Sequence, residues 1–257
     1  MKKLILAAFA LTTAVSVFAQ GTIVFNNRIS GATVVQTSHI WGPAVGVNST
    51  IALVGLGSND NPVGATAYAV NGMRLIGDGG TASVATGDGN FVMGYKTTFA
   101  QLLGIVGQNG QEASLLPLNG VTTFRTGSSL GDVAAINSTM AGQPTSVDAA
   151  FATIELVAWD GSPAAAARAA GFNLAAWGTK GSKGAYDAWQ GGLIAGGVSG
   201  TFNVANIGGS SNPTPVLTSG GAVVPGLSFN LYYVPEPSMF ALAGLGAAAL
   251  MIFRRRK

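Results

Sequence analysis

FATIELVAW (Phe151–Trp159) is apolar on both faces of an extended chain, apart from Thr153 and Glu155. Successive side chains of a strand point to opposite faces, so a strand that is apolar on both faces is one buried on both sides. We therefore predict that Phe151–Trp159 is a central strand of a sheet. A second run, Leu227–Val234, is apolar at alternate positions through LSFNLYY and predicts a half-buried strand.

Working outward from these two runs, short segments of strand composition alternate with glycine-rich turns. The further predicted strands are Thr22–Asn26, Ala32–Thr37, Ser49–Val54, Thr66–Val70, Asn90–Thr97 and Thr201–Ala205. The middle of the chain, 99–143, has poor patterning and gives no clear prediction.

One segment has helix chemistry instead. Ser162 is an N-cap residue, Pro163 suits the first turn, Ala164–Ala170 contains good helix formers, and Gly171 ends the run. Ala185–Gln190 and Leu174–Trp177 each predict a further helical turn. The expected fold class is therefore mainly β, a two-sheet β-sandwich with Greek-key or jelly-roll-like connections and a short helix.

Composition excludes several classes of protein. Only 9% of the 257 residues are charged, and 38 are glycine. Six of the 13 basic residues lie at the two ends of the chain, so the remainder is close to neutral and lacks the basic surface that binds nucleic acid. Because the chain has no cysteine, disulfides, thiolate metal sites and cysteine nucleophiles are all excluded.

The N-terminus has the three parts of a secretory signal peptide. Lys2 and Lys3 precede an apolar run, Leu4–Ala14, and the small side chains of Val17 and Ala19 follow it. We predict a signal peptide over 1–19 that signal peptidase cleaves between Ala19 and Gln20 after the export machinery has engaged it. The folded body is expected over 20–233.

The C-terminus carries a second targeting pattern. Pro235, Glu236 and Pro237 precede the apolar run Met239–Phe253, which predicts a short transmembrane helix. A basic cluster then ends the chain: Arg254, Arg255, Arg256 and Lys257. This cluster favours a cytoplasmic end, with the body on the other side of the membrane.

These features, in this order, resemble the PEP-CTERM sorting signal of Gram-negative and related bacteria over 234–257. The resemblance implies recognition by an exosortase, an integral-membrane enzyme that cleaves near the Pro-Glu-Pro motif. It implies a membrane-anchored precursor and a mature protein at the cell surface or outside the cell. An ordinary tail anchor without processing is the alternative.

Catalytic residues are sparse. His39 is the only histidine, so a Ser-His-Asp triad would have to use it. A glycosidase would need two facing carboxylates, for which Glu155, Asp160, Asp148 and Asp187 are the candidates. Glu155 and Asp160, however, fall on opposite faces of a strand, and Asp160-Gly161 is more simply a turn. We expect no catalytic site, no metal site and no cofactor; the loop acids around Asp60 and Asp88 are more simply turn residues than calcium ligands.

Aromatic residues gather in one window. Trp159, Trp177, Tyr186 and Trp189 lie close in sequence to Asp160 and Asp187. Aromatic faces stack on sugar rings while neighbouring carboxylates bind the hydroxyls, so Trp177, Trp189 and Tyr186 form a candidate glycan platform. Trp159, on the central strand, is expected in the core.

The leading hypothesis is an exported, non-catalytic surface or extracellular-matrix protein; the resemblance to PEP-CTERM proteins implies that it associates with extracellular polysaccharide. The alternative is a carbohydrate-binding or adhesive module whose individual ligand contacts matter. A secreted hydrolase using Asp160 or Glu155 is a third class.

Overall fold

The computed structural model describes six ranges of the chain: 20–30, 35–44, 49–54, 66–78, 93–217 and 228–235. The predicted signal peptide, the apolar run 239–253, the basic cluster and the loop acids Asp60 and Asp88 lie outside these ranges. Within them, no helix is long and apolar enough to cross a membrane.

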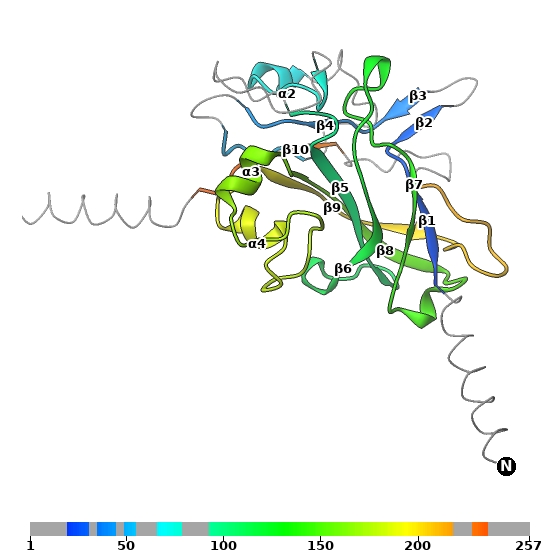
Figure 1. The fold of residues 1–257 in the computed structure, drawn as a ribbon. Coiled ribbons are helices and arrows are strands. Elements are labelled where there is room, and N and C mark those ends of the chain that lie inside the picture. Colours follow the sequence, from blue (N-terminus) through cyan, green and yellow to red (C-terminus); the bar gives the residue numbers. More distant parts are fainter. Residues whose placement is uncertain are drawn as a thin grey trace, which may run out of the picture.

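The fold is built on a six-stranded antiparallel sheet in the order β1-β7-β6-β5-β8-β9 (Figure 1). Its strands are β1 (Thr22–Phe25), β5 (Thr98–Val106), β6 (Leu116–Thr122), β7 (Ile136–Thr139), β8 (Phe151–Asp160) and β9 (Gly196–Ala205). Short 3-10 turns, η3 (Glu112–Ser114), η4 (Gly127–Ser129) and η5 (Pro144–Ser146), interrupt the connections.

The sheet curls, and hydrogen bonds link the segment that follows β9 to the free edge of β1. Thr22 and Gly208 exchange two backbone hydrogen bonds of 3.0 and 3.1 Å. The N–H of Val24 donates to the Pro215 carbonyl at 2.8 Å, and that of Leu217 donates to the Val24 carbonyl at 3.2 Å. The edge of β1 is thereby covered rather than left as an open pairing surface.

β8 is a central strand, as its sequence predicts. It pairs with β5 on one side and β9 on the other, and only Phe151 at its start is exposed. Even-numbered residues such as Ile154 and Leu156 point to one face of the sheet, whereas Val157 and Trp159 point to the other. Both faces are therefore covered.

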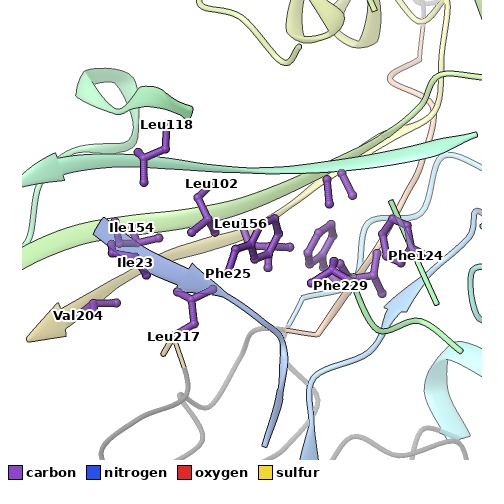
Figure 2. Packing of buried hydrophobic residues seen from close by; sticks show 14 of the residues in the cluster. Ile23, Phe25, Leu102, Leu118, Phe124, Ile154, Leu156, Val204, Leu217 and Phe229 are labelled. Carbon is purple, nitrogen blue, oxygen red and sulfur yellow. The ribbon is translucent and has the colours of Figure 1, made fainter. Parts of the chain in front are cut away.

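The first face forms the inner core, the buried cluster drawn in Figure 2, with Ile154 and Leu156 at its centre. Figure 2 shows β1 across from β8 and β9, with Ile23 and Phe25 directed at those strands. Each of these four side chains is fully buried. Burying such a side chain contributes about 1.5–3 kcal/mol, so this cluster is a principal source of stability.

The second face forms the outer cluster, which is defined by Leu103, Val157, Trp159, Trp177, Trp189 and the helices above them. The helices are α3 (Pro163–Arg168) and α4 (Ala185–Gln190). The Ser162 side chain caps α3 by accepting the N–H of Ala165 at 3.2 Å, as predicted.

Two small sheets and a one-turn helix complete the described chain. β2 (Arg28–Ser30) pairs with β3 (Val35–Thr37), and β4 (Ile40–Trp41) pairs in parallel with β10 (Phe229–Asn230). The helix is α2 (Thr66–Val70).

The prediction of a strand over Thr66–Val70 was wrong. The helical turn points Tyr68 inward, where its ring stacks on Trp41 with centroids 5.1 Å apart. Tertiary burial of one aromatic ring has overridden the strand composition of this short run. Gly72, at φ 75°, follows the helix with a backbone conformation that glycine adopts readily.

Other predictions were confirmed in part. Thr201–Ala205 is the second half of β9, and β3 and β10 fill only portions of their predicted runs. The described parts of Ser49–Val54 and Asn90–Thr97, and the Leu174–Trp177 turn, hold no regular strand or helix.

The mainly β class is confirmed. The described strands form one curled sheet with two small ones, in place of the two large packed sheets of a sandwich. No face of β8 is left for a second large sheet to pack on, because one face lies in the inner core and the other lies beneath α3 and α4.

Candidate ligand-binding cleft

Glu155 is a buried carboxyl group in the middle of β8. Its exposed fraction is 1%, and its side chain lies on the same face as Val157 and Trp159. Among the described residues, no hydrogen-bond partner reaches its Oε1 atom. Buried polar atoms without a partner are rare and costly in folded proteins, so this carboxyl needs an explanation.

A cleft of about 720 Å³ opens over Glu155. The residues that line it are Leu103, Glu112, Ala113, Leu115, Leu116, Glu155, Trp177, Gly178, Thr179, Lys180, Tyr186 and Val198. Its size falls within the range of small-molecule sites, and it combines apolar walls with a few polar groups.

Two loops from distant parts of the sequence border the cleft. On one side, η3 carries Glu112 and leads into Leu115 and β6; on the other, Gly178, Thr179 and Lys180 precede α4. The floor of the cleft is Glu155 of β8, so the two loops border a site that is built on the middle of the sheet.

Gln101 of β5 fixes the second border to the sheet. Its amide Nε2 donates to the Leu118 carbonyl at 2.7 Å, and its Oε1 accepts the N–H of Trp177 at 2.9 Å. Gln101 is itself buried. A buried amide whose donor and acceptor are both hydrogen bonded fixes the position of the loop relative to the sheet.

Asp187 orders the rest of the same loop. Its two carboxylate oxygens accept the N–H groups of Gly181 at 2.9 Å and Lys183 at 2.7 Å. Gly178 and Gly181 have φ of 77° and 84°, which the turn requires. Asp187, one of the acids considered for catalysis, therefore stabilises the conformation of this loop.

Burial raises the pKa of Glu155 from 4.5 to about 8, and the nearby Glu112 carboxylate adds to the rise. Glu155 is therefore mainly protonated at neutral pH. A protonated carboxyl has one O–H donor and one carbonyl acceptor, so the floor of the cleft offers uncharged hydrogen bonding.

The predicted glycan platform is not an open surface. Trp177 and Trp189 are 2% and 4% exposed, and their ring centroids lie 5.3 Å apart. Trp177 and the half-buried Tyr186 line the cleft, whereas Trp189 donates its Nε1–H to the Tyr232 carbonyl at 3.1 Å within the outer cluster. Trp159 is fully buried, as expected for a core residue.

Asp160 does not share the cleft with Glu155. Its carboxylate accepts the N–H of Ser162 at 2.9 Å and lies 3.3 Å from Arg168 Nη2. Asp160 thus joins the end of β8 to α3. The carboxyl that does border the cleft with Glu155 is Glu112, which the sequence did not single out.

Asp148 also has a structural position. It accepts hydrogen bonds from the N–H groups of Ser210, Ser211 and Asn212 and from the Ser210 hydroxyl. These bonds lower its pKa from 3.8 to about 2. Asp148 therefore fastens the loop after β9 as an anion.

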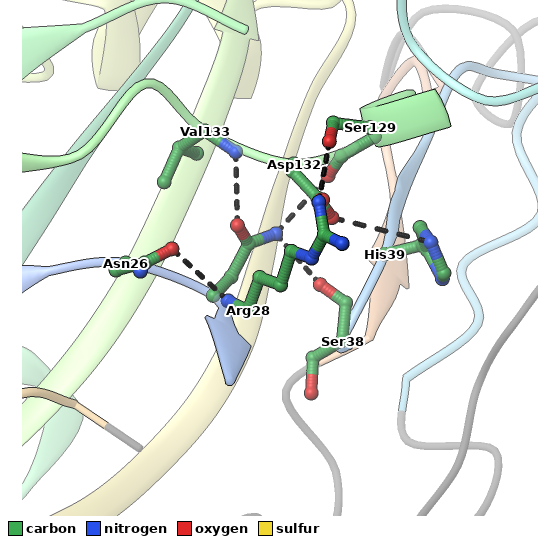
Figure 3. Close-up of polar contacts among 9 residues, drawn as sticks. Asn26, Arg28, Ser38, His39, Ser129, Asp132 and Val133 are labelled. Carbon is green, nitrogen blue, oxygen red and sulfur yellow. Dashed lines mark hydrogen bonds and ion pairs between the residues drawn. The ribbon is translucent and has the colours of Figure 1, made fainter. Parts of the chain in front are cut away.

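His39 lies beside another buried acid, Asp132 (Figure 3). Its Nε2 atom is 4.0 Å from Asp132 Oδ1, and Arg28 Nη1 is 3.9 Å from Oδ2. The nearby Ser129 hydroxyl accepts a 2.6 Å hydrogen bond from Arg28 rather than meeting the histidine. Among the described residues, these contacts do not form a Ser-His-Asp relay.

The cluster around Asp132 holds β2 and β3 against the loop before β7. Asn27 donates to the carbonyls of Ser38 at 2.7 Å and Gly131 at 3.0 Å, and it accepts the N–H of Val133 at 2.9 Å (Figure 3). Burial raises the pKa of Asp132 to about 7, against the lowering effects of Arg28 and Arg125.

The part of the chain that the structure describes contains no group of three or more histidine, cysteine, aspartate or glutamate residues able to hold a metal ion.

Comparison with known proteins identifies the C-terminal segment. A family model described as a PEP-CTERM protein-sorting motif matches residues 234–257. No curated protein and no solved structure matches the chain.

The chain is therefore a protein with a C-terminal sorting signal. The signal is a PEP-CTERM protein-sorting motif, as the sequence predicted, and it supports an exported protein that an exosortase sorts.

Proposed function

We propose that the chain is a surface or extracellular-matrix protein whose body is non-catalytic and associates with extracellular polysaccharide. The observation that carries this proposal is the sorting motif at 234–257, which begins where the described body ends. The signal peptide predicted over 1–19 would start export, and the helix predicted over 239–253 would hold the precursor in the membrane.

The last residues of the body are firmly attached to it. Leu231 donates its N–H to the Trp41 carbonyl at 2.8 Å, and Tyr232 exchanges backbone hydrogen bonds of 2.8 and 3.1 Å with Gly196. Val234 packs against the outer cluster. The first residue of the motif is thus part of the folded body, which supports processing close to Pro235, Glu236 and Pro237.

A second candidate function, a carbohydrate-binding or adhesive module, is favoured by the cleft over Glu155. Tyr186 and Trp177 supply aromatic surface, and Glu155, Glu112 and Lys180 supply polar groups. Under this alternative the cleft itself recognises a sugar, rather than the protein acting only as a bulk matrix component.

The proposal is tested by the intact mass of the protein recovered separately from the membrane and secreted fractions of its own cells. We expect a chain that begins at Gln20 and ends near Pro235–Pro237. Replacing both prolines (Pro235→Ala with Pro237→Ala) should leave the tail attached. The matched control is Pro213→Ala, a proline replacement in a loop of the body, which should be processed normally.

A mass that retains residues 239–257, found only in membranes for the wild type, would overturn exosortase sorting and leave a plain tail anchor. The non-catalytic part has its own test. Release of reducing ends from polysaccharide by the wild type, abolished in Glu155→Gln, would overturn it in favour of a hydrolase.

A further inference from the structure

We propose that the cleft over Glu155 is a binding site for one unit of an uncharged saccharide that carries an apolar substituent such as an N-acetyl group. This inference rests on the proposed function, because it specifies which polysaccharide chemistry the exported body contacts. It is carried by the shape and lining of the cleft together with the unpartnered carboxyl on its floor.

The floor fits a hydroxyl-bearing ligand. Glu155 Oε1 has no hydrogen-bond partner among the described residues, although Glu155 is only 1% exposed. A ligand hydroxyl both donates and accepts, as a protonated carboxyl does, so a sugar hydroxyl can partner this oxygen in either role. Satisfying a buried carboxyl is a larger gain than adding a hydrogen bond at an exposed site.

Thr153 shows that the fold satisfies this face of β8 elsewhere. Its hydroxyl donates to the Gly107 carbonyl at 2.9 Å and accepts the N–H of Gly110 at 2.8 Å. Thr153 is buried two positions before Glu155 on the same face. On this face of β8, the polar side chain with an unpartnered atom is therefore the one that lines the cleft.

The charge of the cleft disfavours ionic ligands. The titratable groups that line the cleft with Glu155 are Glu112 on η3, Lys180 on the loop before α4, and Tyr186 on α4. With Glu155 protonated, one acidic and one basic side chain remain. A uronate bound over the floor would bring its carboxylate near that of Glu112, which is unfavourable.

The walls favour an apolar substituent. Leu103, Leu115, Leu116 and Val198 line the cleft beside the Trp177 and Tyr186 rings. The aromatic surface suits the C–H face of a sugar ring, and the aliphatic side chains suit a methyl group. One added methyl in an apolar pocket is worth roughly 10-fold or more in affinity.

The test is isothermal titration calorimetry on the full-length chain in detergent micelles. Three tetramers serve as probes. The first is β-1,4-linked N-acetylglucosamine, the second is β-1,4-linked glucose, and the third is a tetramer of galacturonate. We expect the N-acetylglucosamine tetramer to bind roughly 10-fold more tightly than the glucose tetramer, and the galacturonate tetramer to bind most weakly.

Variants locate the site. Glu155→Met, which fills the volume without hydrogen bonding, should weaken binding roughly 10-fold, whereas Glu155→Gln should retain binding. Tyr186→Ala should also weaken it. The matched control is Phe151→Ala, which removes another solvent-reaching aromatic ring, at the start of the same strand and outside the cleft. Circular dichroism of each variant verifies that it is folded.

The pH profile separates Glu155 from the other titratable groups. Wild-type affinity should fall as pH rises through about 8, because Glu155 loses its proton beside Glu112. Affinity in Glu155→Gln should not show this fall, although Glu112, Lys180 and Tyr186 are unchanged.

The possible failures are distinguishable. Absence of binding to all three tetramers, or tightest binding of galacturonate, overturns the saccharide class assigned to the cleft. Binding that is unchanged in folded Glu155→Met and Tyr186→Ala overturns the location. Neither result affects sorting, which the intact mass tests separately.

Discussion

The two faces of β8 differ although they belong to one strand. Ile154 and Leu156 point into the inner core together with Ala152 and Ala158. Thr153 and Glu155 point the other way; the first is hydrogen bonded and the second leaves an oxygen without a partner. The difference indicates that the inner face maintains the fold, whereas the outer face carries the candidate site.

The largest expected effect is on the inner face. Leu156→Ala removes a fully buried side chain and leaves a cavity, so we expect the free energy of unfolding to fall by about 2–5 kcal/mol. Chemical denaturation at neutral pH measures it. Saccharide affinity of the folded fraction should be unchanged. A loss of affinity matching that of Glu155→Met would contradict the assignment of binding to the outer face alone.

The outer face should respond in the opposite direction. Glu155→Gln is expected to raise the free energy of unfolding by about 1–3 kcal/mol at pH 9, because the wild type then buries a carboxylate with an unsatisfied oxygen.

The sign follows from proton binding. With a folded pKa of about 8 against 4.5, the native state holds a proton that the unfolded state has lost between these values. The wild type therefore loses stability as pH rises from about 4.5 to about 8, and the glutamine variant lacks this loss. Thr153→Val is the control, with a penalty of about 1 kcal/mol at all pH values. Equal pH profiles for wild type and Glu155→Gln would contradict the assignment.

Asp132 gives a similar but smaller prediction away from the cleft. Its pKa is raised from 3.8 to about 7, so the wild type loses stability as pH rises across that interval. The raised value already includes the lowering effects of Arg28 and Arg125, and we expect Asp132→Asn to remove this pH-dependent loss of stability. Thermal unfolding between pH 4 and 7 measures it; a stability that rises with pH in wild type but not in the variant would be the contrary result.

Asp148 should give the smallest effect and the opposite pH dependence. Its lowered pKa means that its contribution is present above about pH 4 and is lost as pH falls towards 2. In Asp148→Asn this acid-dependent loss should disappear, and the loop Ser210–Asn212 should become easier to cleave by protease at neutral pH. Cleavage of that loop at equal rates in both proteins would argue against the role of Asp148 in fastening it.

Local patterns predicted those parts of the fold that local chemistry determines. Phe151–Trp159 was evident because it is apolar on both faces, and α3 because Ser162, Pro163 and Gly171 occupy their preferred positions. The predicted helical turn Ala185–Gln190 is α4, although no side chain caps its start.

The long middle of the chain was not predictable in the same way. β5 is covered on both faces yet contains Gln101 and Gly104, and β6 contains Pro117 and Gly120, with a register shift between its pairs with β5. Gly104 permits a close approach, because a Cβ there would lie 2.6 Å from Ile154 Cδ1. Such positions depend on tertiary contacts that alternation cannot reveal.

The candidate site was found in part. Glu155 was visible as an acid inside an apolar strand, and Trp177 and Tyr186 as aromatic residues near acids. Glu112 was not visible, because it belongs to the connection after β5 and approaches Glu155 only through the register of β5 and β8. Glu155 and Asp160, which strand alternation places on opposite faces, do not share the cleft, and Asp160 is engaged by Ser162 and Arg168.

The most direct test is the titration of the Glu155 carboxyl in the full-length chain, measured by carbon-13 NMR of the glutamate side chains. The chain has three glutamates, and the carboxyl signal that is missing from the spectrum of Glu155→Gln is that of Glu155. The account predicts a pKa of about 8, moved higher when the N-acetylglucosamine tetramer is bound. A Glu155 pKa near 4.5, unchanged by any tetramer, would contradict it.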